Sequence, residues 1–142
     1  HVVPSRSMQA GLSAAVAYDR RAGGVENAKE MGEALGRVIA GEVTRAVRES
    51  QVDGVKVNAG DFIGLVDDRV IVASTELATV MDAVIARLLE GDHEMLKAFL
   101  GEGDGGVEAK EALERARQRY PKVEVDVQEG GQPYYPVLLA AE

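Results

Sequence analysis

Hydroxyl groups and a guanidinium lie close together near the start of the chain, in the run Pro4-Ser5-Arg6-Ser7, with Gln9 just beyond it. The residues before this run are apolar and the residues after it have helical spacing, so it marks a strand-to-helix junction. Anionic groups in α/β folds often bind at such junctions, because the free N–H groups of the helix point toward them. An ordinary helix cap with Arg6 in solvent explains the same residues, and both interpretations stay open.

The second candidate site is a stiff aromatic loop that precedes an apolar run at the end of the sequence. Its residues are Gly130, Gly131, Gln132, Pro133, Tyr134, Tyr135 and Pro136. The glycines free the backbone and the prolines fix it, and two of the chain's four tyrosines lie between the prolines. The glycine N–H groups could form an anion-binding nest, and tyrosines are favoured in protein interfaces. A plain hairpin turn is the alternative, but a turn does not require Gln132 or the prolines, so the pattern favours recognition.

Other residue types give no support for chemistry within this chain. His1 and His93 are the only imidazoles, and there is no cysteine, so neither a metal site nor a Ser-His-acid arrangement is predicted. The run 101–106 is rich in glycine but contains Glu102 and Asp104, which would repel a pyrophosphate. We therefore predict no catalytic residue, no metal ligand and no cofactor of its own in this chain.

Composition limits the class of protein and its partners. A chain of 142 residues suits one domain, with a core built mainly from Val, Leu, Ile and Ala. The net charge of −8 argues against nucleic acid or an anionic membrane surface as partner. No apolar run reaches the roughly 20 residues of a membrane-spanning helix. The lack of cysteine fits a reducing, cytoplasmic location.

Hydrophobic periodicity predicts two helices first. Residues 7–18 form a helix capped by Ser7, and residues 26–38 form the second. Each has one apolar face. That face consists of Met8, Leu12, Ala15 and Val16 in the first helix, and of Ala28, Met31, Leu35 and Val38 in the second. Gly41 then breaks the helical pattern.

The remaining elements predict an α/β (α+β) fold in which helices cover a mixed sheet. Strands are expected at 42–49, 52–57, 62–66 and 69–73, as an antiparallel β-meander near residues 42–74, and later at 94–100, 123–127 and 137–141. Helices are expected from a Thr75 cap to Gly91, and over 107–119, where Glu111 and Arg115 can pair at four-residue spacing.

These motifs occur in the same order as in one known family, and the resemblance covers nearly the whole chain. The matching blocks are Val2–Ser7 with Gln9–Gly11, Gly41–Arg48, Asp53–Val55, Gly60–Gly64 and Gly130–Pro136. Together they resemble the C-terminal domain of the ATP-binding subunit of fatty acid kinase, also described as dihydroxyacetone-kinase-related. The chain has Pro-Ser-Arg-Ser where the family commonly has Pro-Thr-Lys-Ser, which keeps a hydroxyl and a cation.

The resemblance implies a division of labour between parts of a larger protein. ATP and Mg²⁺ would be held on a separate N-terminal domain, and a DegV-like carrier would deliver a fatty acid whose carboxylate is phosphorylated. The C-terminal domain would dock that carrier and contact the other domains of its own subunit. The family domain also begins with a strand and a helix before the Val-Val-Pro block, so we expect the single domain at 1–142 to be a fragment that lacks them.

The residues predicted to contact a partner or an anion are Ser5, Arg6, Ser7, Gln9, Gly130, Gly131, Gln132, Pro133, Tyr134 and Tyr135. Two alternatives to carrier docking remain open at this point. One is a small-anion sensor or phosphatase-like enzyme that uses Arg6 and the glycine nest. The other is a module that forms homodimers.

Overall fold

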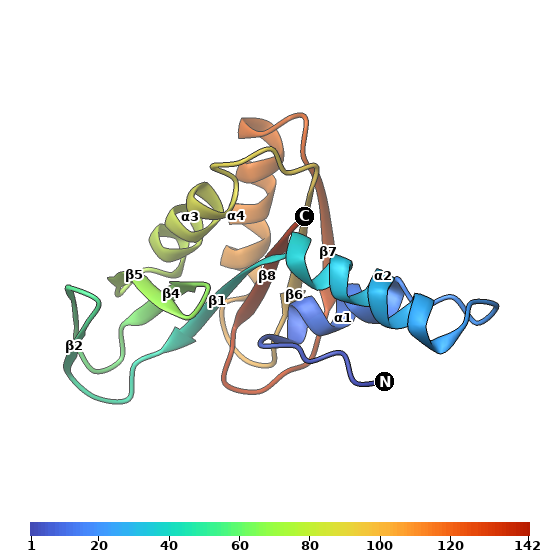
Figure 1. Cartoon of the computed structure of the whole chain (residues 1–142). Helices are drawn as coiled ribbons and strands as arrows, with labels where there is room; N and C mark the ends of the chain where they lie inside the picture. The colour runs from blue at the N-terminus through green and yellow to red at the C-terminus, as the bar shows by residue number, and fades with distance from the viewer.

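A six-stranded mixed sheet with helices on both of its faces organises the chain (Figure 1). The computed structural model describes residues 1–142. The helices are α1 (Met8–Val16), α2 (Gly24–Arg37), α3 (Leu77–Leu88) and α4 (Gly106–Arg119). The strands are β1 (Ile39–Arg45), β2 (Ser50–Val52), β3 (Val55–Val57), β4 (Phe62–Val66), β5 (Arg69–Ser74), β6 (Met95–Leu100), β7 (Glu124–Glu129) and β8 (Val137–Ala141). The predicted fold class is therefore confirmed.

Strand β8 lies inside the sheet, whose order is β5-β4-β1-β8-β6-β7. It pairs antiparallel with β1 on one side and with β6 on the other, and only β6 and β7 are parallel. All five of its residues are buried. This burial on both faces explains why residues 137–141 form a continuous apolar run and do not alternate.

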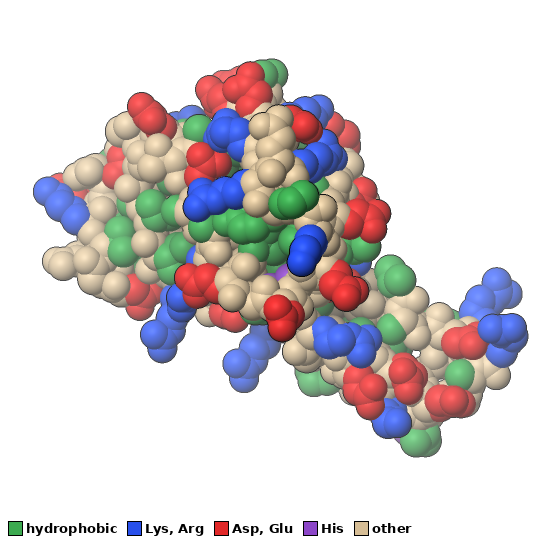
Figure 2. Space-filling model, turned by 90° about the horizontal axis from the view of Figure 1, so that it is seen from above, with side chains coloured by type: hydrophobic (Ala, Val, Ile, Leu, Met, Phe, Trp, Pro, Cys, Tyr) green, Lys and Arg blue, Asp and Glu red, His purple; other side chains and the backbone are tan.

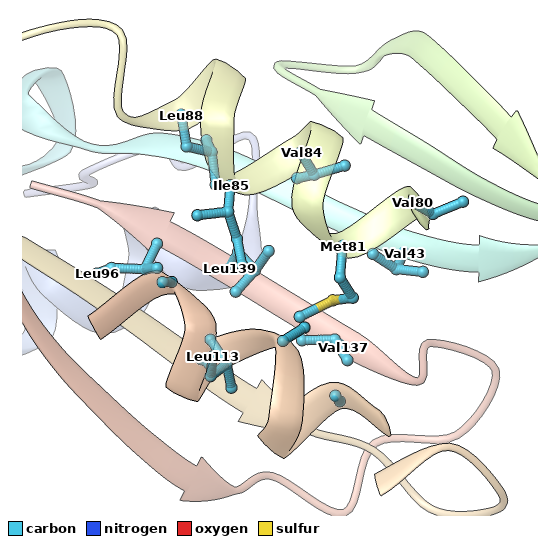
Figure 3. Packing of buried hydrophobic residues seen from close by; sticks show 14 of the residues in the cluster. Val43, Val80, Met81, Val84, Ile85, Leu88, Leu96, Leu113, Val137 and Leu139 are labelled. Atoms are coloured by element: carbon cyan, nitrogen blue, oxygen red, sulfur yellow. The ribbon is translucent and has the colours of Figure 1, made fainter. Parts of the chain in front are cut away.

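The main core lies between the sheet and helices α3 and α4. Figure 3 shows Val84 of α3 and Leu113 of α4 on the same side of the sheet as Leu139 of β8. Helix α3 approaches the sheet at two glycines, Gly41 in β1 and Gly64 in β4. A Cβ atom at Gly64 would lie 2.5 Å from Val84 Cγ2 and 2.8 Å from Val72 Cγ1. The close seating of α3 therefore requires residues without a side chain at these positions.

Helices α1 and α2 form an arm on the opposite face of the sheet. Helix α1 lies against the sheet, while α2 packs on α1 and projects beyond the sheet (Figures 1 and 2). The turn between them is held by the buried Asn27, whose Nδ2 donates to the carbonyls of Asp19 and Ala22 at 2.9 and 3.2 Å. As predicted, Ser7 caps α1, because its Oγ accepts from the N–H of Ala10 at 3.1 Å.

A polar contact joins the middle of α1 to the last residue of the chain. Ser13 Oγ donates to the carboxylate of Glu142, and Lys97 Nζ lies 3.1 Å from the same carboxylate. Partial burial by itself would raise the pKa of Glu142. The hydrogen bonds from Ser13 and Lys97 outweigh that effect, so the pKa lies below its usual value. The charged form of Glu142 therefore helps to hold α1 on the sheet.

Several local predictions were wrong. Residues 52–57 are not one strand, because Asp53 and Gly54 adopt positive φ angles of 51° and 80° and turn the chain between β2 and β3. This hairpin forms a separate two-stranded sheet, so only β1, β4 and β5 make the expected antiparallel series. Strand β1 ends at Arg45 and does not continue to residue 49.

Helix ends and surface pairs also differ from expectation. The N-cap position of α3 is Glu76, with no side-chain cap bond, and not Thr75; the helix ends at Leu88, before Gly91. Arg115 pairs with Asp82 of α3 at 3.0 Å instead of with Glu111. The longest helices have 14 residues, and none has the length and apolar character needed to cross a membrane.

Candidate functional site

Both predicted loops meet the outward side of strand β1, the side that faces away from α3. Gly41 and Val43 point into the core, so Glu42 and Thr44 point to the opposite face. Thr44 Oγ1 donates to the carbonyl of Tyr134 at 3.0 Å. Glu42 lines a surface hollow together with Arg6. The N-terminal junction and the C-terminal aromatic loop, far apart in sequence, thus lie at neighbouring outward positions of one strand.

The aromatic loop does not turn a hairpin. Strand β7 pairs with β6, and β8 lies on the other side of β6, so the loop crosses the end of β6. The N–H groups of Gly130 and Gly131 both donate to the carbonyl of Leu100, at 2.8 and 3.0 Å. The expected anion nest was therefore wrong, because a backbone oxygen of the protein already occupies it.

Gln132 holds the loop in a fixed shape. Its Nε2 donates to the carbonyl of Phe99 at 2.9 Å and to the carbonyl of Tyr135 at 3.1 Å. Its backbone carbonyl accepts from the N–H of Glu102 at 3.0 Å. Gly101 permits this crossing, because a Cβ there would collide with the carbonyl oxygens of Gln132 and Tyr135. Gln132 was predicted as a contact residue, and the structure places its amide inside the loop.

Tyr134 is the most prominent side chain of the loop, with 86% of its surface exposed. Its φ of 67° lies in the left-handed region, which is unfavourable for a residue with a Cβ. Pro133 is exposed beside it, and Tyr135 is 37% exposed. The fold therefore keeps a strained tyrosine outward on a loop that is anchored to two strands. Strain of this kind concentrates at functional sites.

The N-terminal group divides into exposed and buried residues. Ser5 and Arg6 are exposed, and Ser7 is used as the helix cap. Gln9 is only 1% exposed, and its Nε2 donates to the carbonyl of Gly41 at 3.0 Å. Gln9 therefore fixes α1 to β1 and offers no surface to a partner, whereas Arg6 remains available.

Three carboxylates share the hollow with Arg6. Glu42, Asp67 and Asp68 all line it. Partial burial, together with repulsion from Asp68, raises the pKa of Glu42 above its usual value. An anion would meet these negative charges, so the arrangement does not support the small-anion interpretation of Arg6. It suits a partner surface that brings a positive charge.

The substitution Glu42→Gln tests the electrostatics of this hollow. A carboxyl whose pKa is raised by folding destabilises the folded state once it is ionised. We expect Glu42→Gln to raise the free energy of unfolding at pH 7. The gain should shrink as the pH falls below the usual pKa of a glutamate, because Glu42 is then neutral in both states. Urea unfolding at pH 7 and pH 4 measures both values, and Glu111→Gln on the exposed side of α4 serves as the control. A gain at pH 7 that persists at pH 4 would contradict this account.

The glycine-rich segment before α4 does not suit a nucleotide phosphate. Gly105 takes the N-cap position of α4, and its φ is 108°. Asp104 and Glu108 line the hollow at this helix end, so negative charge faces the position that a phosphate would take. No group of three or more His, Cys, Asp or Glu side chains in the chain is placed to hold a metal ion.

Sequence reasoning missed four residues that shape this surface. Thr44 and Glu42 looked like ordinary strand positions, although alternation around the buried Val43 places both on the outward side of β1. Asp67 and Asp68 looked like a turn, and their positive φ angles of 46° and 66° agree with that. Only the pairing of β1 with β4 shows that this turn borders the same hollow.

Comparison with known proteins agrees with this geometry at the level of family. Uncharacterized protein SERP0792 of Staphylococcus epidermidis is 31% identical over 141 residues, which cover 99% of this chain and 26% of that protein. Uncharacterized protein SAR1202 of Staphylococcus aureus has the same identity and coverage. The chain thus spans about a quarter of the length of these relatives. All of residues 1–142 match the model of the FakA-like C-terminal domain of fatty acid kinase. The chain therefore belongs to the FakA-like family of fatty acid kinase C-terminal domains.

Proposed function

We propose that this chain is a docking domain that binds a DegV-like fatty-acid-binding protein. The carrier presents the fatty acid, and ATP held on another domain of the same subunit supplies the phosphoryl group. A carboxylate oxygen of the fatty acid attacks the γ-phosphorus, and the bond between that phosphorus and the bridging oxygen breaks. The products are an acyl phosphate and ADP. No residue of this chain takes part in that step.

The observation that carries the proposal is the exposed, strained Tyr134 on its anchored loop. Tyrosines placed rigidly on a surface are frequent energetic centres of protein interfaces, because little side-chain entropy is lost on binding. Arg6 and the acidic hollow lie beyond Thr44 on the same face, which gives the interface a second, charged contact region. The domain would act by positioning, since small displacements of a reacting group lower its rate strongly.

Calorimetric titration of the whole subunit with a fatty-acid-loaded DegV-like carrier from the same organism tests the proposal. We expect saturable binding that weakens by about tenfold or more in Tyr134→Ala, as for an interface centre, and by less in Arg6→Ala. Tyr18→Ala is the matched control, because Tyr18 is also exposed but lies near the far end of the arm. An unmodified subunit that does not bind the carrier would refute the docking role. Equal affinity in all three variants would remove these two residues from the interface.

A further inference from the structure

Helix α1 is turned inside out relative to an ordinary surface helix. Its side toward the sheet carries polar Gln9 and Ser13, which are 1% and 8% exposed. Its side away from the sheet carries Met8, Leu12 and Val16, which are 50%, 44% and 81% exposed. The sequence correctly predicted one apolar face for this helix. The expectation that such a face covers the core was wrong, because polar residues take the inward side.

The outward face has the composition of a buried surface. The nine residues of α1 include no charged side chain. Met8, Leu12 and Val16 follow one another at four-residue spacing, so they form a continuous apolar stripe along the helix. A helix that faces water normally has charged or polar residues on that side. A helix with polar contacts to a sheet and an apolar outer stripe is suited to lie between two layers of one structure.

We propose that this outer stripe of α1 is the surface on which the polypeptide preceding residue 1 of the longer protein packs. That segment would bring an apolar face against Met8, Leu12 and Val16 and complete a second layer over α1. The inference does not depend on the proposed docking of a carrier, since the stripe and the aromatic loop are separate surfaces.

The relatives and the path of the chain support this occupant. The matched relatives are about four times as long as this chain, and the family is described as C-terminal, so most of their additional length precedes it. The chain reaches α1 through Val2, which is 89% exposed, and Val3, and these residues extend the apolar surface. A covalently attached segment is present at high effective concentration beside the stripe. A second copy of the chain would instead bring another net charge of −8.

Single cysteines in the longer protein test the proposal directly. The present chain has no cysteine, so Val16→Cys and Leu12→Cys introduce defined probes, with native cysteines elsewhere replaced. Val107→Cys on α4 is the matched control, because Val107 is 73% exposed, close to the 81% of Val16. The measurement is the rate of maleimide labelling, normalised to the rate of the same variant in urea. Circular dichroism confirms that each variant is folded.

We expect Val16→Cys and Leu12→Cys to react at least about tenfold more slowly than Val107→Cys, because they react only after local opening. Equal normalised rates for Val16→Cys and Val107→Cys would overturn the proposal, since nothing would then cover the stripe. Slow labelling that becomes fast on dilution would also overturn it, because the cover would then be a second copy. Slow labelling that is independent of concentration, with Val107→Cys fast, is the supporting result.

Discussion

Gly64→Ala is expected to lower the free energy of unfolding by about 2 kcal/mol, which is typical of an overpacked core. The added methyl group would lie 2.5 Å from Val84 Cγ2 and 3.0 Å from Val80 Cγ1, both on α3. Val72 on β5 is also too close, at 2.8 Å, so the methyl group cannot move sideways. The helix must therefore lift from the sheet. For a chain of this length the melting temperature should fall by about 6 °C, which differential scanning calorimetry measures.

Gly32→Ala provides the matched control with the opposite sign. Gly32 lies inside α2, and a Cβ there would have nothing within 4 Å. Alanine loses less backbone entropy than glycine in a helix, so this variant should gain about 0.5–1 kcal/mol. The same chemical change would then destabilise the protein at one site and stabilise it at another. A neutral Gly64→Ala variant would mean that α3 does not lie over β4 as closely as described.

The elements with strong periodicity could be predicted from the sequence, and the exceptions have tertiary causes. The alternation in Phe62–Val66 gave β4 with its observed bounds. Gly41 was wrongly taken as a breaker between elements. It lies within β1, where a Cβ would be 2.8 Å from Leu88 Cδ1 and 2.9 Å from Val84 Cγ1. Its small size serves the packing of a distant helix, which local pattern cannot reveal. Asp53 and Gly54 are different, because an Asp-Gly pair is a turn signal that was available and was not used.

The candidate surface was predictable only in part. The unusual composition of the loop around Tyr134 singled it out, and the capping role of Ser7 followed from residue type. The use of the Gly130 N–H by Leu100 could not be foreseen, because it depends on β7 pairing with β6. The burial of Gln9 was hidden for a similar reason. A polar residue in a helix is expected outward, and the reversed orientation of α1 follows from contacts that are distant in sequence.

Tyr134→Gly is expected to separate stability from binding. Glycine adopts the left-handed region without the steric penalty of a Cβ, so relief of strain should offset its greater entropy in the unfolded chain. Stability should therefore stay unchanged or rise by up to about 1 kcal/mol. Loss of the exposed ring should weaken carrier binding by about 2 kcal/mol, close to thirtyfold, if the ring is an interface centre. Urea unfolding and calorimetric titration of the same preparation measure the two effects.

Tyr134→Ala isolates the backbone contribution, because it removes the ring and keeps the Cβ. Both variants should lose carrier affinity equally, whereas the alanine variant should be less stable than the glycine variant by about 1 kcal/mol. Equal stability of the two variants would show that residue 134 does not hold its φ of 67° in solution. Unchanged affinity in both would show that the strained conformation serves a purpose other than presenting this ring. Reduced affinity together with the stability difference would mean that the fold accepts strain at one residue in order to place an aromatic contact.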